Sequence, residues 1–272
     1  MAQHPCILTI AGSDSGGGAG IQADLKTMTV LGGFGMSVIT ALTAQNGLGV
    51  RGIHAPDPEF ITLQLQTVLE GFPVRAAKTG MLFSAPIICA VADALHGHSF
   101  PLVVDPVCVS QTGHRLLEPE AIDTLRARII PEADLLTPNK PEAEALSGIV
   151  ITSPADLARA ADALLSVGAG AILIKGGHFN GEDQACRDTA ITDWLCLPGK
   201  KPEAITHPKV NTINNHGTGC TLSAAIATRL GFGDALADAI RSAQRYLDCC
   251  LAASYTPGKG VGPVNHAAPF QQ

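Results

Sequence analysis

The chain has 272 residues, a net charge of −6, a pI near 5.8, and a composition that is 46% hydrophobic but only 4% aromatic. This length allows one large α/β domain or two small ones, and we expect a single domain over residues 1–272. The acidic balance argues against a general nucleic-acid binder. No apolar run reaches the roughly 18 residues of a membrane span, so no membrane partner is expected either.

The expected strands and helices alternate along the chain. Short, near-continuous apolar runs are typical of parallel strands covered on both faces, and segments of helical periodicity separate them. The alternation predicts right-handed βαβ units in one mostly parallel sheet flanked by helices on both faces. The expected strands cover 6–10, 102–106, 133–139 and 171–177, and the expected helices cover 59–69, 119–130 and 153–168. Residues 199–208 are the most loop-like interior stretch, and the tail after residue 256 is expected to be irregular.

The cysteines and the first residues predict a reducing compartment. Eight cysteines occur without any C-x-x-C spacing, and Cys249 and Cys250 are adjacent, which suits neither a zinc site nor an ordinary disulfide. No basic start with an apolar h-region precedes residue 6. We therefore expect a cytoplasmic protein with reduced thiols.

Four polar residues follow expected strands. They are Asp14, Asp105, Asn139 and Lys175. In open α/β sheets, ligands bind beyond the carboxyl ends of the strands. We expect these four side chains to lie on one rim of the sheet, close to the helix that contains Cys220.

The segment 216–225 predicts an anion site. Gly217 and Gly219 leave backbone N–H groups unshielded before an alanine-rich helix begins, and a helix start favours bound phosphate. Gly217, Thr218 and Gly219 are the expected phosphate contacts. Cys220 lies in the first turn, where the same field favours the thiolate. The alternative is a glycine-rich loop with a buried cysteine.

The glycine loop over residues 14–20 has the wrong spacing for a dinucleotide site. With Gly16 and Gly18 in place, the third required position is Ile21, and no G-x-x-x-x-G-K-[ST] motif occurs. A dehydrogenase and a P-loop protein are therefore excluded. The loop still permits close approach of the backbone to a ligand, although a plain tight turn is the alternative.

The segment 139–142 combines a helix start with a carboxylate. Pro141 suits the first turn of a helix, and Glu142 lies in the same turn. Glu142 could simply complement the helix dipole. Together with Asp105, it could instead order Mg²⁺, which favours a few carboxylates plus phosphate oxygens.

Two further positions carry less specific signals. Lys175 precedes two glycines and could balance the charge of a transferring phosphate, or it could be solvated. Gln45 could bind a heterocycle through its amide, with an ordinary loop amide as the alternative. Met81 follows another expected strand end and is otherwise a core methionine.

Taken together, these stretches resemble the hydroxymethylpyrimidine/phosphomethylpyrimidine kinases of thiamine biosynthesis, in the ribokinase-like superfamily. The resemblance runs from about residue 8 to residue 266. It departs from the superfamily at Cys220, where aspartate is usual, and there agrees with the pyrimidine-kinase branch. Cys108 and residues 110–112 depart from the more usual residues near Val107. The stretches that carry the resemblance are 11–24, 37–42, 44–46, 78–82, 104–107, 137–144, 175–178 and 216–225.

The resemblance implies two successive ATP-dependent phosphorylations by a ribokinase-like fold, usually a homodimer. It implies Cys220 and Lys175 as catalytic residues and Mg²⁺ supported by Asp105 and Glu142, with Asn139 in its water shell. It also implies substrate contacts from Gln45, Met81, Val107 and Asp24. A pyridoxine or pyridoxal kinase, alone or as a second activity, and a non-catalytic pyrimidine-binding protein are the alternatives.

Overall fold

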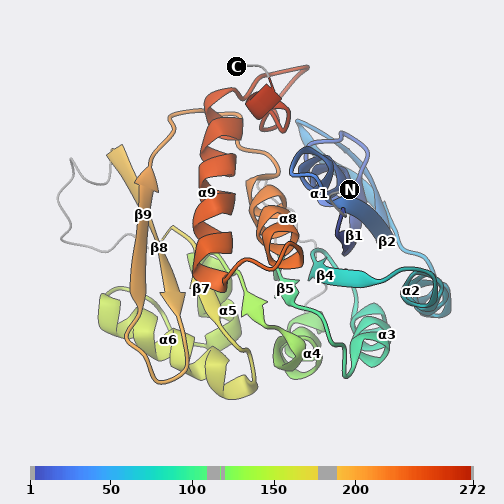
Figure 1. Ribbon diagram of the computed structural model, residues 1–272, viewed down its shortest axis with the longest axis horizontal. Helices are drawn as coiled ribbons and strands as arrows, with labels where there is room; N and C mark the ends of the chain where they lie inside the picture. The colour runs from blue at the N-terminus through green and yellow to red at the C-terminus, as the bar shows by residue number, and fades with distance from the viewer. Residues whose placement is uncertain (1–3, 109–116, 118–119, 177–188, 271–272) are drawn as a thin grey trace.

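The computed structural model describes residues 4–108, 117, 120–176 and 189–270 (Figure 1). Within them, one sheet has the strand order β3-β2-β1-β4-β5-β6-β7-β8-β9. Neighbours from β2 to β7 are parallel, whereas β3, β8 and β9 pair antiparallel at the two edges. The strands are β1 (Cys6–Asp14), β2 (Phe34–Asn46), β3 (Gly49–His54), β4 (Val74–Thr79), β5 (Leu102–Val104), β6 (Leu135–Leu136), β7 (Ile172–Ile174), β8 (Ala190–Cys196) and β9 (Glu203–Pro208).

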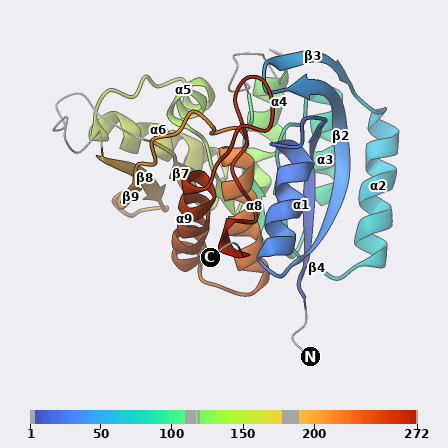
Figure 2. The same cartoon turned by 90° about the horizontal axis from the view of Figure 1, so that it is seen from above.

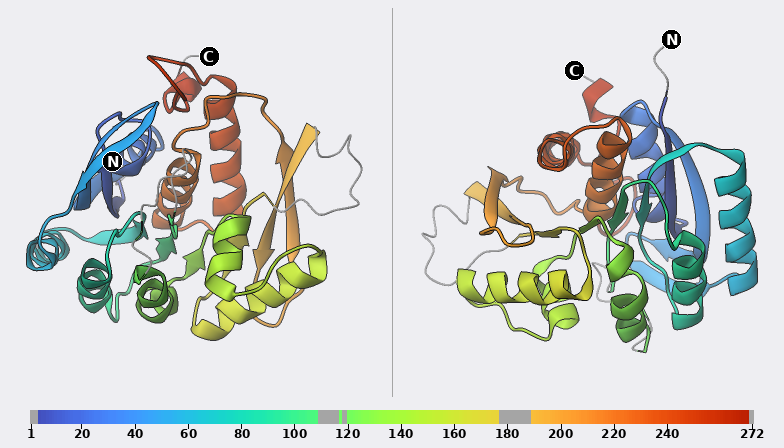
Figure 3. Two further views of the ribbon diagram at one scale, coloured as in Figure 1. Left: turned by 180° about the vertical axis from the view of Figure 1, so that it is seen from behind. Right: turned by 60° about the horizontal axis from the view of Figure 1, so that its bottom comes forward.

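Helices cover both faces of this sheet, as the alternation of elements predicts (Figures 2 and 3). Helices α2 (Pro58–Gly71), α3 (Ala85–Leu95), α4 (Ala121–Arg128), α5 (Lys140–Ser147) and α6 (Pro154–Val167) share one core with one face. Helices α1 (Gly20–Val30), α8 (Thr218–Gly231) and α9 (Leu236–Ala252) share a second core with the other face. The short 3₁₀ segments are η1 (Ile130–Glu132) and η2 (Ala268–Phe270).

The central strands are apolar because each contributes to both cores. In β5, Leu102 and Val104 pack in one core and Val103 in the other, all fully buried. Successive strand side chains point to opposite faces, so a strand between two helical layers is covered on both sides, which favours apolar residues at successive positions. This explains why continuous apolar runs, and not alternating ones, mark these strands in the sequence.

The prediction of a loop over residues 199–208 was wrong in its second half. Residues 203–208 form β9, which pairs with β8 in register from Ala190 opposite Pro208 to Leu195 opposite Glu203. Glycine, lysine and proline before residue 203 obscure the strand in the sequence. The sequence-based interpretation also ended the first strand too early, at residue 10, because β1 continues to Asp14 through a register shift between Ala11 and Ser13.

The structure also shows the length and polarity of the helices and the state of the cysteines. No helix in the described part of the chain is both long and apolar enough to cross a membrane. The described cysteines, which include the adjacent Cys249 and Cys250, are free thiols.

Candidate active site

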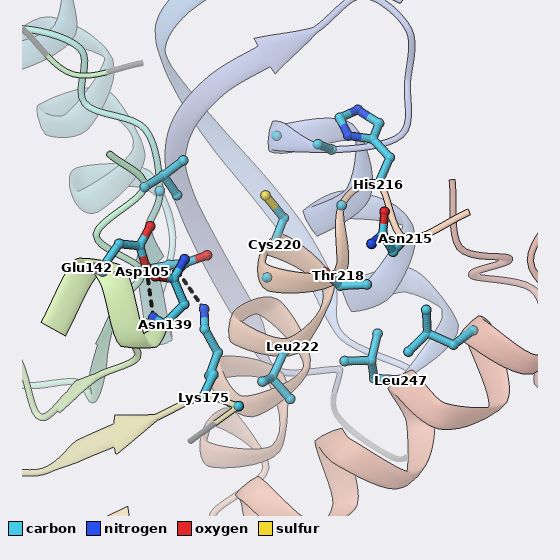
Figure 4. Close-up of a pocket in the computed structure, with 18 of the residues that line it drawn as sticks. Asp105, Asn139, Glu142, Lys175, Asn215, His216, Thr218, Cys220, Leu222 and Leu247 are labelled. Atoms are coloured by element: carbon cyan, nitrogen blue, oxygen red, sulfur yellow. Dashed lines mark hydrogen bonds and ion pairs between the residues drawn. The ribbon is translucent and has the colours of Figure 1, made fainter. Parts of the chain in front are cut away.

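A pocket of about 690 Å³ opens beyond the carboxyl ends of the central strands. Elements far apart in sequence meet there: the loop after β1, the end of β2, the segments after β4, β5 and β7, and the start of α8 (Figure 4). Of the residues predicted from sequence, all but Asp24 line the pocket. The four rim residues Asp14, Asp105, Asn139 and Lys175 are among them, which confirms that they lie on one rim.

The turn that leads into α8, residues 216–220, is built for close backbone approach, and we call it the anion turn. Gly217 has φ +84, and a Cβ there would lie 1.9 Å from the carbonyl oxygen of Gly18. At Gly219 a Cβ would lie 3.3 Å from Asp105 Oδ2 and 3.5 Å from Lys175 Nζ. The first turn of α8 therefore lines the pocket beside a carboxylate and an ammonium group, with the N–H of Thr218 already donating to the Asn215 carbonyl at 3.3 Å. Such a helix start favours an anion through its orphan donors and its dipole.

Burial opposes the thiolate that the helix start is expected to favour at Cys220. Cys220 lies in the first turn of α8 and is partly accessible from the pocket. Burial nevertheless raises the pKa of its thiol to about 12, although Lys78 acts in the opposite direction. Removing a charged sulfur from water outweighs the field of one helix start. Cys220 is therefore a thiol at neutral pH until its surroundings change.

Lys175, Asp105, Glu142 and Asn139 form a cluster on one side of the pocket (Figure 4). Lys175 Nζ lies 3.2 Å from Asp105 Oδ1, and the backbones of Asn139 and Lys175 form a parallel bridge. Burial lowers the pKa of Lys175, but the carboxylates of Asp105 and Glu142 more than offset it, so the pKa is raised. Lys175 is therefore held as a cation next to the anion turn.

Glu142 and Asn139 are placed by the start of α5. Asn139 Oδ1 accepts the N–H of Glu142 at 2.9 Å, and Glu142 Oε2 accepts the N–H of Asn139 at 2.9 Å. This reciprocal capping box satisfies two donors of the helix start. Burial raises the pKa of the Glu142 carboxyl; Lys175 opposes this and Asp105 adds to it.

The donor set suits a magnesium ion that arrives with a triphosphate. Asp105 and Glu142 are two buried carboxylates, exposed by 3% and 8%, with oxygen donors of the type that Mg²⁺ prefers. The described residues contain no group of three or more histidine, cysteine or acidic side chains placed to hold a metal. Two carboxylates do not make a full coordination shell, so phosphate oxygens and water must supply the remaining ligands.

The loop 14–20 is organised by the buried carboxylate of Asp14. It accepts the N–H groups of Gly16 at 2.7 Å, Gly18 at 3.0 Å and Ala19 at 2.9 Å. His216 Nε2 donates to the same carboxylate at 2.8 Å. Burial raises the pKa of Asp14. The hydrogen bond and charge of His216 and the backbone N–H groups of Ala19 and Gly16 lower it by more, so the pKa lies below its ordinary value. His216 thereby joins the first glycine loop to the anion turn.

The end of the pocket near β1, β2 and β4 has an apolar floor and one amide. Met81 packs with Ala41 and Val50, and Val107 joins this cluster. The hydroxyl of Thr40 donates to the Met81 carbonyl at 2.6 Å, which holds the segment after β4 in place. Gln45 lies at the edge of the cluster, with its Nε2 3.3 Å from His216 Nε2. An apolar surface with one oriented amide suits a flat heteroaromatic ring.

Asp24 does not line the pocket, in contrast to its predicted role as a substrate contact. Its carboxylate is fully buried on α1, where it accepts the Thr9 hydroxyl at 2.6 Å and pairs with Lys78 at 3.2 Å. A carboxylate on a helix is usually exposed, and no local pattern predicts a role for Lys78, the first residue of the stretch 78–82. Their pairing depends on α1 packing on β1 and on β4 pairing with β1, which sets Lys78 opposite Thr9.

The opposite end of the pocket escaped the sequence analysis. Leu222, Leu247 and Leu251 line it from α8 and α9, and Asp193 and His207 line it from β8 and β9. Asp193 Oδ1 accepts the N–H of Gly176 at 2.8 Å, which fixes the backbone immediately after Lys175. Because β9 was interpreted as loop, the sequence offered no reason to place His207 near the site. Gly177 and His178, which belong to one of the stretches that carry the resemblance, lie outside the described residues.

His207 makes a pH-dependent contribution to stability. Burial lowers its pKa, but Asp193 at 3.6 Å and Asp248 at 3.0 Å raise it to about 9. The folded pKa exceeds the unfolded one, so the stabilisation is complete below pH 6.5 and is lost as pH rises through about 9. We expect His207→Gln to lower the free energy of unfolding by up to about 3 kcal/mol at acidic pH, since one pKa unit corresponds to ~1.36 kcal/mol. Urea unfolding of the wild type and of His207→Gln from pH 6.5 to above 9 tests this prediction. A difference in the free energy of unfolding between the two proteins that does not shrink toward high pH would contradict it.

Comparison with known proteins gives one consistent result. A sequence model of the phosphomethylpyrimidine kinase family matches residues 14–265. The chain is 46% identical over 261 residues to the thiamine biosynthesis bifunctional protein ThiED of Geobacter sulfurreducens; the match covers 96% of the chain and about half (52%) of that protein. It is 44% identical over 270 residues to a hydroxymethylpyrimidine/phosphomethylpyrimidine kinase of Haemophilus influenzae, with 98% of both covered.

A solved structure with the same fold is an ADP complex of Bacillus subtilis pyridoxal kinase. It superposes with a TM-score of 0.86 at 33% identity and covers 99% of this chain and 100% of that one. This likeness confirms the ribokinase-like α/β fold. The family match over residues 14–265 and the near full-length relatives agree with the resemblance seen in the sequence. The chain belongs to the phosphomethylpyrimidine kinase family.

Proposed function

We propose that this chain transfers the γ-phosphoryl group of ATP to 4-amino-5-hydroxymethyl-2-methylpyrimidine, and then transfers a second one to the resulting monophosphate. The product is the diphosphate used in thiamine diphosphate biosynthesis. The relatives named as hydroxymethylpyrimidine/phosphomethylpyrimidine kinases over nearly their whole length support both substrates. The proposal includes a single domain over residues 1–272, a cytoplasmic location and a homodimer.

One observation carries the reaction type. The first turn of α8 lines the pocket at the carboxyl edge of a mostly parallel sheet, and a Cβ at Gly219 in that turn would contact both Asp105 and Lys175. Phosphoryl transfer needs little covalent chemistry from the protein and depends on positioning and charge stabilisation. Amides that receive the γ-phosphoryl oxygens, with a lysine beside them, supply both.

We assign the two substrates to opposite ends of the pocket. Gln45, Met81 and Val107 form the apolar end with one amide, which we assign to the aminopyrimidine ring. Leu222, Leu247 and Leu251 form the end near β8 and α9, which we assign to the nucleoside of ATP. Because β2 and β8 lie on opposite sides of the sheet order, the triphosphate would cross the anion turn between them.

The two phosphorylations make different demands on Cys220. In the first, the hydroxymethyl oxygen forms a bond to the γ-phosphorus while the bond to the ADP oxygen breaks, and the hydroxyl proton passes to the Cys220 sulfur. Cys220 must therefore be deprotonated before it can act as the general base. In the second, the nucleophile is a phosphate oxygen that is already anionic at neutral pH, so a base contributes little.

Asp105 and Glu142 would hold Mg²⁺, with Asn139 in its water shell. When bound, Mg²⁺ neutralises charge on the phosphate oxygens and orients them. The repulsion between the two carboxylates, which contributes to the raised pKa of Glu142, favours a cation between them. Lys175 supplies the remaining positive charge during transfer.

A pyridoxal kinase activity is the second candidate. The solved pyridoxal kinase of Bacillus subtilis, with a TM-score of 0.86 and 33% identity, favours it. Pyridoxal and pyridoxine also carry a hydroxymethyl group on a nitrogen heterocycle. Gln45 is the residue most able to discriminate between the pyrimidine and pyridoxal rings, because its amide contacts the ring substituents directly in the proposed arrangement.

A direct assay distinguishes the candidates. The protein is incubated with ATP, Mg²⁺ and either hydroxymethylpyrimidine or pyridoxal, and the products are identified by mass spectrometry. We expect mono- and diphosphorylated pyrimidine, and no product from either ring when EDTA removes the metal. Phosphorylation of pyridoxal but not of hydroxymethylpyrimidine would assign the second candidate. The absence of a phosphorylated product from either ring would overturn both candidates.

A further inference from the structure

Lys78 is a buried cation to which the proposed mechanism gives no role. It lies near the end of β4 and is 0% exposed, among the largest fully buried side chains of the described chain. Its Nζ lies 3.2 Å from both carboxylate oxygens of Asp24, which is also 0% exposed. Replacing a buried ion pair by apolar residues is often neutral or stabilising. Stability alone therefore does not account for this pair.

The pair lies directly behind the active site. Helix α8 packs on β4 with its last residue, Gly231, against Ala76, so its first turn lies toward the other end of β4, where Gly80 and Cys220 line the same pocket. Gly80 lines the pocket, and a Cβ at Gly80 would come within 3.0 Å of Lys78 Nζ. The ammonium group thus lies against the backbone that forms the pocket wall. It has no exposed surface through which water could screen its charge.

A hydrogen bond from Thr9 fixes the orientation of the pair of Lys78 and Asp24. The Thr9 hydroxyl donates to Asp24 Oδ2 at 2.6 Å, which anchors the carboxylate on the β1 side of Lys78. Burial lowers the pKa of Lys78, but the negative charge of Asp24, with a further contribution from Asp105, more than offsets this, so the pKa is raised and Lys78 is a cation. The contacts with Thr9 and between the two side chains hold the pair as a dipole in one orientation, although burial raises the pKa of Asp24 against the opposing effects of Lys78 and Thr9.

Cys220 lies in the field of this dipole. The charged groups that act on its thiol are Lys78 from β4, Asp24 from α1 and Asp105 after β5, and the N–H of Gly20 also bonds to it. Burial is the largest influence and raises the pKa of the thiol; among the charges, Lys78 acts most strongly and lowers it, ahead of the opposing Asp24 and Asp105. The sulfur therefore experiences the positive end of the pair more than the negative end.

We propose that the Lys78–Asp24 pair presents its positive end to Cys220 and favours the thiolate that accepts the substrate proton. Lys78 is thus a positioning residue that acts through Cys220 and does not touch the reacting atoms. The catalytic part of this inference rests on the proposed function, whereas the charge coupling does not. A coupling of this kind requires that removal of Lys78 and removal of Asp24 affect the thiol in opposite directions.

The coupling is measured by alkylation of Cys220 with iodoacetamide in the ligand-free protein across pH. Quantifying the Cys220 peptide by mass spectrometry separates it from the other cysteines. Below the thiol pKa, a shift of one unit changes the thiolate fraction about tenfold. We expect Asp24→Asn to speed alkylation and Lys78→Met to slow it, each by about that factor.

The double variant Lys78→Met/Asp24→Asn keeps the test decisive if either single variant fails to fold, because it leaves no unpaired buried charge. We expect it to alkylate more slowly than the wild type, because the wild-type pair has a net positive effect on the sulfur. Lys201→Met, which removes an exposed surface charge, serves as the matched control and should alkylate as the wild type does. Unchanged rates, or single variants that shift the same way, would overturn the proposal; so would a double variant at or above the wild-type rate.

Activity supplies a second readout. In the double variant we expect kcat of the first phosphorylation to fall several-fold, with its pH dependence moved to higher pH, while the second phosphorylation is nearly unchanged. A purely structural role for the pair would slow both steps together. Because alkylation needs no phosphoryl transfer, failure of the proposed function would leave the alkylation result standing, and failure of the coupling would leave the function standing.

Discussion

Cys220→Ala is expected to slow the first phosphorylation by roughly 10²–10⁴-fold, the usual contribution of a general base, and to leave the second nearly unchanged. The first nucleophile is a neutral hydroxyl that must lose a proton, whereas the second is a phosphate oxygen that is already charged. Alanine removes the sulfur but keeps the helix start, so the N–H groups of the anion turn stay in place. Single-turnover rates for the two steps, with each substrate supplied separately, measure the difference.

Cys249→Ala is the control for this comparison, because Cys249 is an exposed free thiol on α9 and does not line the pocket. It should behave as the wild type in both steps. An equal loss in both steps of Cys220→Ala would contradict the assignment of a base and leave Cys220 a role in packing alone. The high pKa of its thiol adds a second expectation, that the first step accelerates with rising pH well above neutrality.

Gly217→Ala is expected to slow both phosphorylations by about 10²–10³-fold, the loss seen when one donor of an oxyanion hole is removed. Residue 217 has φ +84, and a Cβ there would lie 1.9 Å from the carbonyl oxygen of Gly18. The turn must shift to relieve this contact, which moves the amides that receive the γ-phosphoryl group. Steady-state kinetics with both substrates, together with the half-saturating ATP concentration, check the prediction.

Gly199→Ala is the matched control for the backbone penalty. Residue 199 also has positive φ, +68, but a Cβ there meets nothing within 4 Å. Both substitutions carry the cost of a left-handed conformation, about 1–2 kcal/mol in unfolding free energy. Both variants should therefore lose stability, but only Gly217→Ala should also lose activity. Full activity of Gly217→Ala in a folded protein would show that the anion turn is not where the γ-phosphoryl group binds.

Much of the candidate site was predictable because the fold is regular. Asp105 and Lys175 each follow a buried apolar strand, and parallel strands end on the same edge of the sheet. The structure places their charged atoms 3.2 Å apart. The capping box of Asn139 and Glu142 is likewise local, since residues three positions apart meet at a helix start.

Other features depend on contacts that no local pattern contains. The pair of Lys78 and Asp24 joins residues 54 positions apart, and nothing in the sequence near either residue identifies the other as its partner. The link between His216 and Asp14 spans 202 positions. The state of the Cys220 thiol is a balance between desolvation and several charges from different elements, and the sequence around the helix start contains none of these.

The amino-acid sequence by itself determined the layered α/β architecture, the family, the anion turn and the order of the polar residues along the strand edge, because apolar periodicity, glycines and capping residues act over a few positions. Only the tertiary structure decided which carboxylates are buried, which lysine lies behind the pocket wall, and that residues 203–208 form an edge strand. Burial and charge are properties of the assembled surroundings of a side chain, and those surroundings come from elements distant in the chain.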